Sequence, residues 1–294
     1  MKKLNEMTYG IVGVGLMGGS LAKAIRQNVL GTPGAKGKIF GCDINKSSLE
    51  EARNSFVIDE AFTLDQVDMM LCDCDFVYVC LYPDATVRFL CQHRAAFKRG
   101  AIVSDISGVK ANLFKHLDEI LREDTDFIPG HPMAGNEREG FSYSSGSIFK
   151  NHNYILMPLE QNRSESVELF RLLIAEMGFT RIVTADAHIH DHKIAFTSQL
   201  CHVIASALVD SAEDTSVTAF GGGSFEDLTR IALINAPLWT ELFLANKEEL
   251  LSHIGAFESS LGELKKLIAE NDAKGLEAYL SQVRQKRSQM TLKA

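Results

Sequence analysis

Residues 8–28 read TYGIVGVGLMGGSLAKAIRQN, and this stretch decides the fold of the N-terminal half. An apolar run over 8–14 is typical of a buried strand, and 18–28 has the pattern of a helix. The glycines between them fit G-x-G-x-x-G, in which the first makes a tight turn, the second admits a pyrophosphate and the third lets the helix pack. Helix N-terminal amides then bind the phosphates. The residues predicted to hold a dinucleotide are Gly13, Gly15, Leu16, Met17 and Gly18.

A second apolar run ends in IFGCDIN, residues 39–45, and supplies an acid at the expected place. An acid at the end of the second strand accepts a hydrogen bond from a ribose 2′-hydroxyl and repels a 2′-phosphate. Asp43 therefore favours NAD over NADP as the cofactor, although Lys46 nearby keeps NADP open. A glycine-rich turn that binds no nucleotide is the alternative interpretation.

The order of elements indicates an α/β fold. Apolar strand candidates at 8–14, 38–43, 75–81 and 101–106 alternate with helical patterns, and further strands are expected at 152–158 and 181–183. Such alternation is typical of a doubly wound, Rossmann-type parallel sheet covered on both faces. After Asp186 the strands cease, and helices are expected at 187–212, 224–234, 237–267 and 272–289. We predict a dinucleotide-binding domain over 1–186 and an all-helical substrate-binding and dimerisation domain over 187–294.

The bulk composition limits the functional classes. A hydrophobic content of 46% and a charged content of 23% are those of a globular protein, and the net charge of −8 argues against nucleic acid or a membrane surface as a partner. No apolar run is long enough to span a bilayer. The six cysteines form no C-x-x-C pair and most lie in apolar runs, which favours buried thiols and a cytoplasmic location. Long apolar helix faces in the second half predict a homodimer.

A second segment, FIPGHPMAGNEREG at 127–140, places one histidine among three glycines and two prolines. Pro132 restricts the backbone of His131 to extended conformations, while the glycines permit turns. The segment is therefore expected to orient one imidazole. A dehydrogenase that removes hydride from an alcohol carbon needs a base for the hydroxyl proton, and neutral histidine suits that task near pH 7.

The chain resembles the prephenate dehydrogenase family and its arogenate-using relatives. The resemblance rests on separate motifs in the family order, which are GVGLMGGSLA, DISGVK, GHPMAG, HDHKIAFTSQLCH, FEDLTRIA and the region of Trp239 and Asn246. It implies an NAD-dependent oxidoreductase of tyrosine biosynthesis, an aromatic amino acid pathway. The implied reaction is oxidative decarboxylation of prephenate to 4-hydroxyphenylpyruvate, or of arogenate directly to tyrosine. Hydride goes to NAD, and loss of carbon dioxide makes the ring aromatic.

The resemblance also assigns roles to single residues. It implies that His131 removes the substrate hydroxyl proton and that Arg230 holds a carboxylate, for which the guanidinium fork is suited. The family pattern near S-H-L-P-H is Ser198-Gln199-Leu200-Cys201-His202 here, so Ser198 and His202 are expected in the substrate site and Gln199 replaces a histidine. The family's D-V-G-S-V-K serine stands where this chain has Gly108, and Ser107, one position earlier, is carried over as a catalytic candidate.

Other interpretations remain open at this stage. Arg230 could pair with Glu226 on one helix. A 3-hydroxyacid dehydrogenase would use a lysine such as Lys193, and an NAD-sensing protein would need no catalysis. His188 and His192 have the spacing of metal ligands, but no clear third ligand follows and hydride transfer needs no metal, so no metal is expected. Replacement of the family proline by Cys201 predicts a straighter helix.

Overall fold

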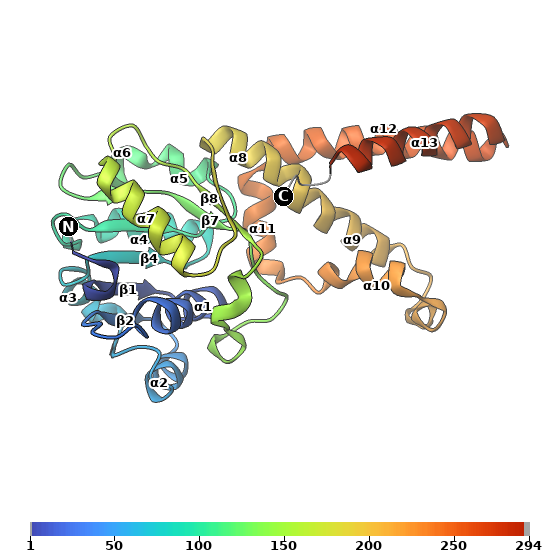
Figure 1. The fold of residues 1–294 in the computed structure, drawn as a ribbon. Helices are drawn as coiled ribbons and strands as arrows, with labels where there is room; N and C mark the ends of the chain where they lie inside the picture. The colour runs from blue at the N-terminus through green and yellow to red at the C-terminus, as the bar shows by residue number, and fades with distance from the viewer. Residues whose placement is uncertain (1, 291–294) are drawn as a thin grey trace. The chain divides into compact units, whose positions relative to one another are not determined.

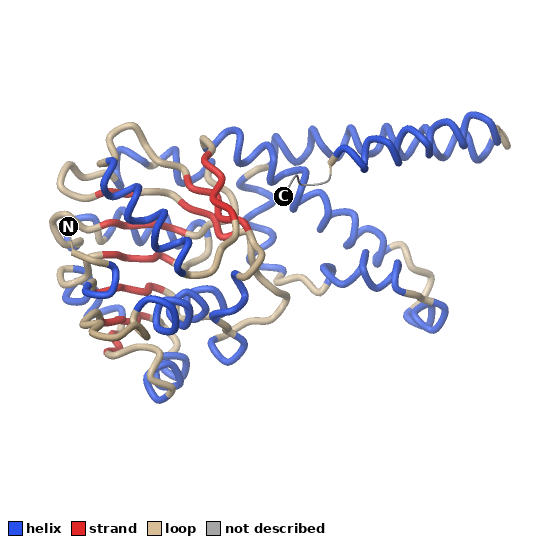
Figure 2. Tube along the Cα trace, viewed as in Figure 1, coloured by secondary structure: helices blue, strands red, loops and turns tan. Residues whose placement is uncertain are grey.

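The computed structural model describes residues 2–290, which form two compact units that meet in sequence at Asn246 and Lys247. The first unit contains a six-stranded, all-parallel sheet in the order β3-β2-β1-β4-β5-β6 (Figures 1 and 2). This order and direction confirm the predicted Rossmann-type sheet. Its strands are β1 (Thr8–Val12), β2 (Lys38–Cys42), β3 (Glu60–Phe62), β4 (Phe76–Val79), β5 (Ile102–Asp105) and β6 (Asp126–Phe127).

Both faces of the sheet are buried, which explains why its strands read as nearly continuous apolar runs. Along β4, Phe76 and Tyr78 enter one core cluster and Val77 and Val79 enter the other. The first cluster includes side chains of α1, α2 and α7, and the second includes side chains of α3, α4, α5 and α6. These helices are α1 (Leu16–Ala24), α2 (Lys46–Asn54), α3 (Val67–Leu71), α4 (Pro83–Gln92), α5 (Ala111–Lys115), α6 (Leu117–Ile120) and α7 (Ser164–Glu176).

The chain makes a sharp turn between β1 and α1. Gly13 has a φ of +89°, a conformation that L side chains rarely adopt, and a Cβ there would lie 2.4 Å from the Cys80 carbonyl oxygen at the end of β4. A Cβ on Gly18 would lie 1.9 Å from the Gly13 carbonyl oxygen. The two glycines therefore let the helix start close against the strands, at the point where the strand order reverses between β1 and β4.

The expected strands near 152–158 and 181–183 exist, but they lie outside the main sheet. They are β8 (Asn153–Leu156) and β9 (Arg181–Thr184), and with β7 (Gly130–Pro132) they form a second sheet in the order β7-β8-β9. The β7 and β8 strands run antiparallel, with His131 opposite Ile155, so this sheet is mixed. Pro132 is tolerated because β7 is an edge strand of this sheet.

Beyond β9 every assigned element is helical, as predicted. The expected helix at 187–212 contains a π-helical segment, η7, between its α-helical parts, and the straighter path expected from Cys201 stays a prediction. These elements are α8 (Ala187–Ile194), η7 (Ala195–Gln199), α9 (Leu200–Asp210), η8 (Thr215–Phe220), α10 (Gly223–Thr229), η9 (Arg230–Ala232), α11 (Ala236–Ala245), α12 (Lys247–Ala269) and α13 (Ala273–Gln289).

The expected single helix at 237–267 is two helices, α11 and α12. Asn246 separates them with a non-helical φ of −117° and ψ of 30°. Its side-chain amide donates hydrogen bonds to the Asp191 carbonyl oxygen at 2.9 Å and to Gln199 Oε1 at 2.8 Å. These bonds fix a buried side chain at the position where the first unit ends.

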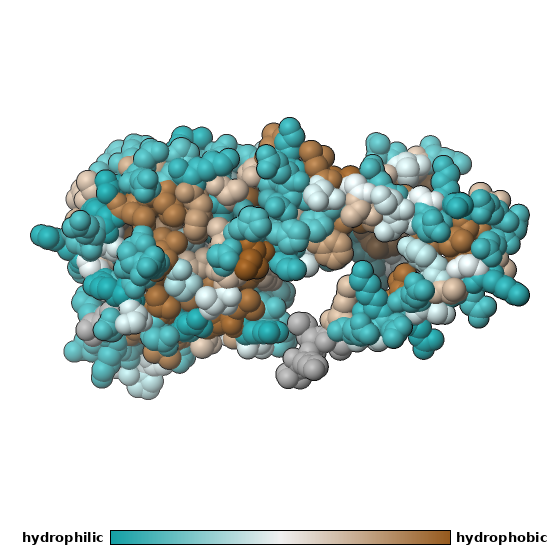
Figure 3. Space-filling model, turned by 90° about the horizontal axis from the view of Figure 1, so that it is seen from above, coloured by the Kyte–Doolittle hydropathy of each residue, from teal (hydrophilic) through white to brown (hydrophobic). Residues whose placement is uncertain are grey.

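The second unit consists of α12 and α13, which pack against each other (Figure 1). Apolar side chains remain exposed on both helices, including Leu261, Ile268 and Leu280. On the face of the protein drawn in Figure 3, hydrophobic side chains gather in patches among a largely hydrophilic surface. Among residues 2–290 we find no helix with the length and apolar character needed to cross a membrane.

Candidate active site

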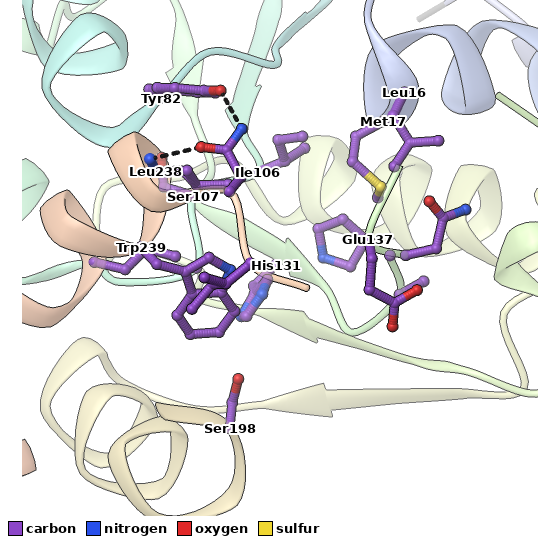
Figure 4. A pocket seen from close by; sticks show the side chains of 18 of the residues that line it. Leu16, Met17, Tyr82, Ile106, Ser107, His131, Glu137, Ser198, Leu238 and Trp239 are labelled. Atoms are coloured by element: carbon purple, nitrogen blue, oxygen red, sulfur yellow. Dashed lines mark hydrogen bonds between the residues drawn. The ribbon is translucent and has the colours of Figure 1, made fainter. Parts of the chain in front are cut away.

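A cavity of about 650 Å³ lies in the first unit, at the carboxyl ends of β1 and β4. Its wall runs from the glycine turn after β1, past the loops after β4 and β5, to η7, η9 and α11. His131, Ser107, Ser198, His202 and Arg230 all line it. Figure 4 shows the side chain of Ser198 directed from its helix toward the space that His131, Trp239 and Glu137 border. The cavity thus brings together predicted residues from both halves of the sequence.

One end of the cavity has the features of a pyrophosphate site. A Cβ on Gly15 would meet no heavy atom within 4 Å, so the backbone there is open to a ligand. Gly15 is also the N-cap of α1 and offers no side-chain cap, which leaves the first amides of the helix for phosphate. Leu16, Met17 and Gly18 line the same end. These residues fit a dinucleotide held as the sequence predicts.

Asp43 lies directly after β2, where the ribose of such a cofactor would bind. Its Oδ2 accepts a hydrogen bond from the Val14 amide at 2.6 Å, and its Oδ1 accepts one from the Asn45 amide at 2.8 Å. A carboxylate has more acceptor sites than these two bonds use. The backbone bonds fix the position of the carboxylate and leave it able to accept from a ribose hydroxyl.

A buried ion pair fixes the strand that carries His131. Lys110 and Asp105 have fully buried side chains, and Lys110 Nζ lies 2.6 Å from Asp105 Oδ2. The same ammonium donates to the Gly130 carbonyl oxygen at 2.7 Å, the residue before His131. Burial lowers the pKa of Lys110, and the nearby Asp105 opposes that shift. Asp105 at the end of β5 and Gly130 in β7 are therefore linked through the Lys110 ammonium. Breaking this ion pair would leave a buried charge without a partner, which is strongly destabilising.

His131 continues into a chain of ring contacts. Its Nδ1 lies 2.9 Å from His190 Nε2, and His190 Nδ1 lies 2.7 Å from Asp191 Oδ1. Burial, together with His190 and Lys110, holds the pKa of His131 well below its usual value of 6.5. Burial also lowers the pKa of His190, against the opposing hydrogen bond to Asp191. Both imidazoles are therefore neutral at pH 7, and His131 can act as a base.

The other end of the cavity carries an aromatic pair and a guanidinium. The His202 ring stacks on Trp239 with a centroid distance of 3.5 Å, and its Nδ1 donates to the Ser198 carbonyl oxygen at 2.9 Å. Arg230 forms an ion pair with Glu137, which lies on the loop after His131, and does not pair with Glu226. The guanidinium is 63% exposed in this pair. Such a pair is weak in water and can exchange for another carboxylate.

Two predicted residues, Gln199 and Ser107, line the same cavity as the others but differ in their hydrogen bonding. Gln199 is buried, its amide nitrogen donates to the Leu242 carbonyl oxygen at 2.7 Å, and its Oε1 accepts from Asn246. These bonds give it a structural role, and direct contact with substrate stays a prediction. Ser107 is buried on the cavity wall, and its Oγ has no hydrogen-bond partner among residues 2–290. At Gly108 an added Cβ would lie 3.7 Å from His131 Nε2, so a side chain at that position would face the base.

The sequence had placed the residues that support His131 within its motifs, but it had assigned none of them that role. Lys110 and Asp105 were visible only as the ends of DISGVK, and their pairing depends on the loop between them folding back. His190 and Asp191 read as polar residues at a helix start. Only the approach of α8 to β7 brings His190 to His131, and no local pattern in the sequence encodes that approach.

A neutral base faces this cavity, and a pyrophosphate cradle forms its far end. That arrangement serves the removal of a hydride and a proton from an alcohol by a nicotinamide dinucleotide. The protein is an NAD-dependent dehydrogenase. Lys193, the base expected of a 3-hydroxyacid dehydrogenase, is exposed and is not among the residues that line the cavity.

The comparison with known families assigns the dehydrogenase more closely. Residues 21–183 match the family described as prephenate dehydrogenase, nucleotide-binding domain, and residues 186–282 match prephenate dehydrogenase, dimerization domain. The chain belongs to the prephenate dehydrogenase family. The compact units of the structure instead divide at Asn246 and Lys247, so the domain boundary at residue 186 stays a prediction.

Individual relatives are similar over most of the chain. A crystal structure of prephenate dehydrogenase from A. aeolicus, in complex with hydroxyphenyl propionate and NAD+, is 32% identical and covers 98% of this chain and 100% of its own, with a TM-score of 0.86. Prephenate dehydrogenase of Bacillus subtilis (strain 168) is 26% identical over 99% of this chain and 78% of its own. Cyclohexadienyl dehydrogenase of Zymomonas mobilis is 29% identical over 89% of this chain and 88% of its own.

Proposed function

We propose that the protein catalyses the NAD-dependent oxidative decarboxylation of prephenate to 4-hydroxyphenylpyruvate, a step of tyrosine biosynthesis. One observation carries the proposal: His131 and Arg230, from different halves of the sequence, line one cavity with the glycine turn after β1. A base and a guanidinium on the wall of one cavity suit a small cyclohexadienol acid, with its hydroxyl at one end and a carboxylate at the other.

Each residue of the cavity has its own role in the proposed reaction. His131 Nε2 accepts the hydroxyl proton, and Arg230 exchanges Glu137 for a substrate carboxylate. Trp239 and His202 form the aromatic wall beside the ring. A dinucleotide held at the glycine turn by Gly13, Gly15 and Gly18 would supply the acceptor for the hydride of the hydroxyl-bearing carbon. The ring carboxylate then leaves as carbon dioxide, its bonding electrons make the ring aromatic, and His131 returns its proton to the phenol oxygen.

Arogenate is the alternative substrate, since it differs from prephenate only by an amino group in place of the side-chain keto group. Relatives named for prephenate and for cyclohexadienyl substrates are both similar to this chain. The deciding experiment mixes the pure protein with NAD and either compound and follows NADH at 340 nm, a wavelength set by the cofactor. Turnover of prephenate well above arogenate supports the proposal. No turnover of either compound would refute it.

NAD is proposed as the cofactor in preference to NADP because Asp43 lies where a 2′-phosphate would bind, and like charges there repel. In the variant Asp43→Asn the ratio of kcat/KM for NAD to that for NADP should fall. Equal use of both cofactors by the unaltered protein would contradict this part of the proposal.

We also propose a homodimer formed through the helical region. On α12, Leu261 is 54% and Ile268 is 62% exposed, and apolar side chains exposed on one helix face often mark an interface. Light scattering should give twice the chain mass, and Leu261→Glu with Ile268→Glu should give a monomer, whereas Lys266→Glu, on another face of α12, should not. All six cysteines are free thiols, which fits the proposed cytoplasmic location.

A further inference from the structure

Asp191 is the first residue of a chain of hydrogen bonds that leads through His190 to His131, and backbone amides fix the orientation of its carboxylate. Its Oδ1 accepts from the backbone amide of Lys110 at 2.9 Å, and its Oδ2 accepts from the amide of Ala111 at 2.7 Å and from that of Lys110 at 3.1 Å, at the start of α5. These two donors come from an element far away in sequence. Oδ1 also accepts from His190 Nδ1, whereas Oδ2 accepts from the backbone amides alone. The side chain of Asp191 is almost fully buried.

The roles of the ring nitrogens follow from the chemistry of the last member. A carboxylate has only acceptors, so His190 Nδ1 must donate the 2.7 Å bond to Asp191. A neutral His190 then carries no proton on Nε2 and must accept the 2.9 Å bond from His131 Nδ1. His131 therefore carries its single proton on Nδ1, and the lone pair of Nε2 is free on the cavity side, beside Gly108.

The charged groups near the hydrogen bonds that join Asp191, His190 and His131 are compatible with this assignment of protons. Lys110 is the cation that acts on both imidazoles, and its Nζ donates to Asp105 and to the Gly130 carbonyl oxygen. Lys110 contacts Asp191 only through its backbone amide. Burial lowers the pKa of both imidazoles, so neither is charged near pH 7. The two rings meet edge to face, at an interplanar angle of 72°.

We propose that His190 and Asp191 are positioning residues that hold His131 in the tautomer with its proton on Nδ1, so that Nε2 can take the substrate proton. The inference rests on the proposed function for the identity of that proton. When His131 gains a second proton at Nε2, its Nδ1–H bond to His190 and the adjacent carboxylate stabilise the positive charge. No proton needs to pass along the chain.

The test is the isosteric variant Asp191→Asn. We expect the amide oxygen at the Oδ2 position, where the Ala111 and Lys110 amides both donate, at 2.7 Å and 3.1 Å, and the NH2 group at the Oδ1 position beside His190. The NH2 group then donates to His190 Nδ1, which moves the His190 proton to Nε2 and forces the His131 proton to Nε2 as well. His131 loses its base at the cavity. We expect kcat to fall by about 10²- to 10⁴-fold, with KM for both substrates little changed.

The matched variant is His190→Gln, since a glutamine Oε1 can accept from His131 Nδ1 without Asp191. It should retain more activity than Asp191→Asn, whereas His190→Leu, which offers no acceptor, should retain less than His190→Gln. A wild-type kcat in Asp191→Asn would overturn the proposal. So would equal loss in His190→Gln and His190→Leu, because that result indicates packing alone.

A measurement without substrate separates this inference from the proposed function. In protein labelled with ¹⁵N-histidine, the ring nitrogen spectra should show His131 protonated on Nδ1, and in Asp191→Asn protonated on Nε2. Spectra with the wild-type His131 protonated on Nε2 would overturn the inference even if the enzyme is active. The expected spectra in a protein that turns over neither prephenate nor arogenate would leave the positioning intact and refute the proposed function.

Discussion

At the scale of single residues, the proposed reaction depends most on His131, the base that takes the hydroxyl proton. Its replacement gives the first prediction. An asparagine can still hydrogen-bond the substrate hydroxyl but cannot take its proton. His131→Asn should therefore lower kcat by about 10²- to 10⁴-fold with a smaller change in KM, as measured by initial rates of NADH formation. His152, which lines the same cavity and bonds the Lys150 carbonyl oxygen, is the control. His152→Asn should keep kcat, and unchanged turnover in His131→Asn would contradict the base assignment.

The guanidinium of Arg230 gives a prediction of the opposite kind. A hydrogen bond to a charged group contributes about 1.5–3 kcal/mol, so Arg230→Ala should raise KM for prephenate by roughly 10- to 100-fold and lower kcat less. Arg230→Lys keeps the positive charge but loses the planar guanidinium, so its KM for prephenate should lie between those of the wild type and Arg230→Ala. KM values from saturation curves decide the matter. An unchanged KM in Arg230→Ala would mean that the arginine serves only its pair with Glu137.

Single residues could be predicted from the sequence where a short motif contains them, and not where their role depends on a partner far away in the chain. His131, Ser198, His202 and Arg230 stand in motifs, and the structure places all four on one cavity. The partner of Arg230 could not be predicted, because Glu137 lies 93 positions away in the chain. The same holds for His190 and His131, which are 59 positions apart. Motifs identify chemistry, whereas long-range packing decides its partners.

At the scale of elements, the turn from β1 to α1 gives a prediction with an internal control. Gly15 has a φ of −87° and open space at the Cβ position, so Gly15→Ala should leave the melting temperature unchanged but raise KM for NAD, because the methyl group enters the phosphate site. In Gly18→Ala the methyl group would collide with the Gly13 carbonyl oxygen, at a cost of about 1–3 kcal/mol, and the melting temperature should fall. Equal effects on both properties in the two variants would contradict these separate roles.

Elements were predictable where their pattern was long. The strands that became β1, β2, β4 and β5 were all expected, since both faces of each are buried. The strands β3 and β6, with three and two residues, carry too little pattern to be seen. The second sheet was missed because its strands resemble those of the main sheet, and only the antiparallel approach of β7 to β8 distinguishes it. The break at Asn246 depends on tertiary hydrogen bonds to α8 and η7.

At the scale of the whole molecule, the buried histidines link folding to pH. The pKa values of His131, His190 and His202 are all lowered, mainly by burial. In the unfolded chain these imidazoles take up protons as the pH falls through 6.5, whereas the folded protein does not until lower pH. Because the unfolded state then binds more protons, acid favours it, and the stability contributed by the neutral rings is lost as the pH falls below 6.5.

The free energy of unfolding should therefore decrease between pH 7.5 and 5.5, by up to about 1.4 kcal/mol per pH unit for each such histidine. Urea unfolding at a fixed protein concentration measures it, since association would otherwise shift the midpoint. His190→Gln removes one of the groups, so its curve should be less steep below pH 6.5 and parallel to wild type above pH 7.5. A wild-type stability that stays flat or rises toward pH 5.5 would show that these imidazoles are charged in the folded protein, and a charged His131 could not serve as the base.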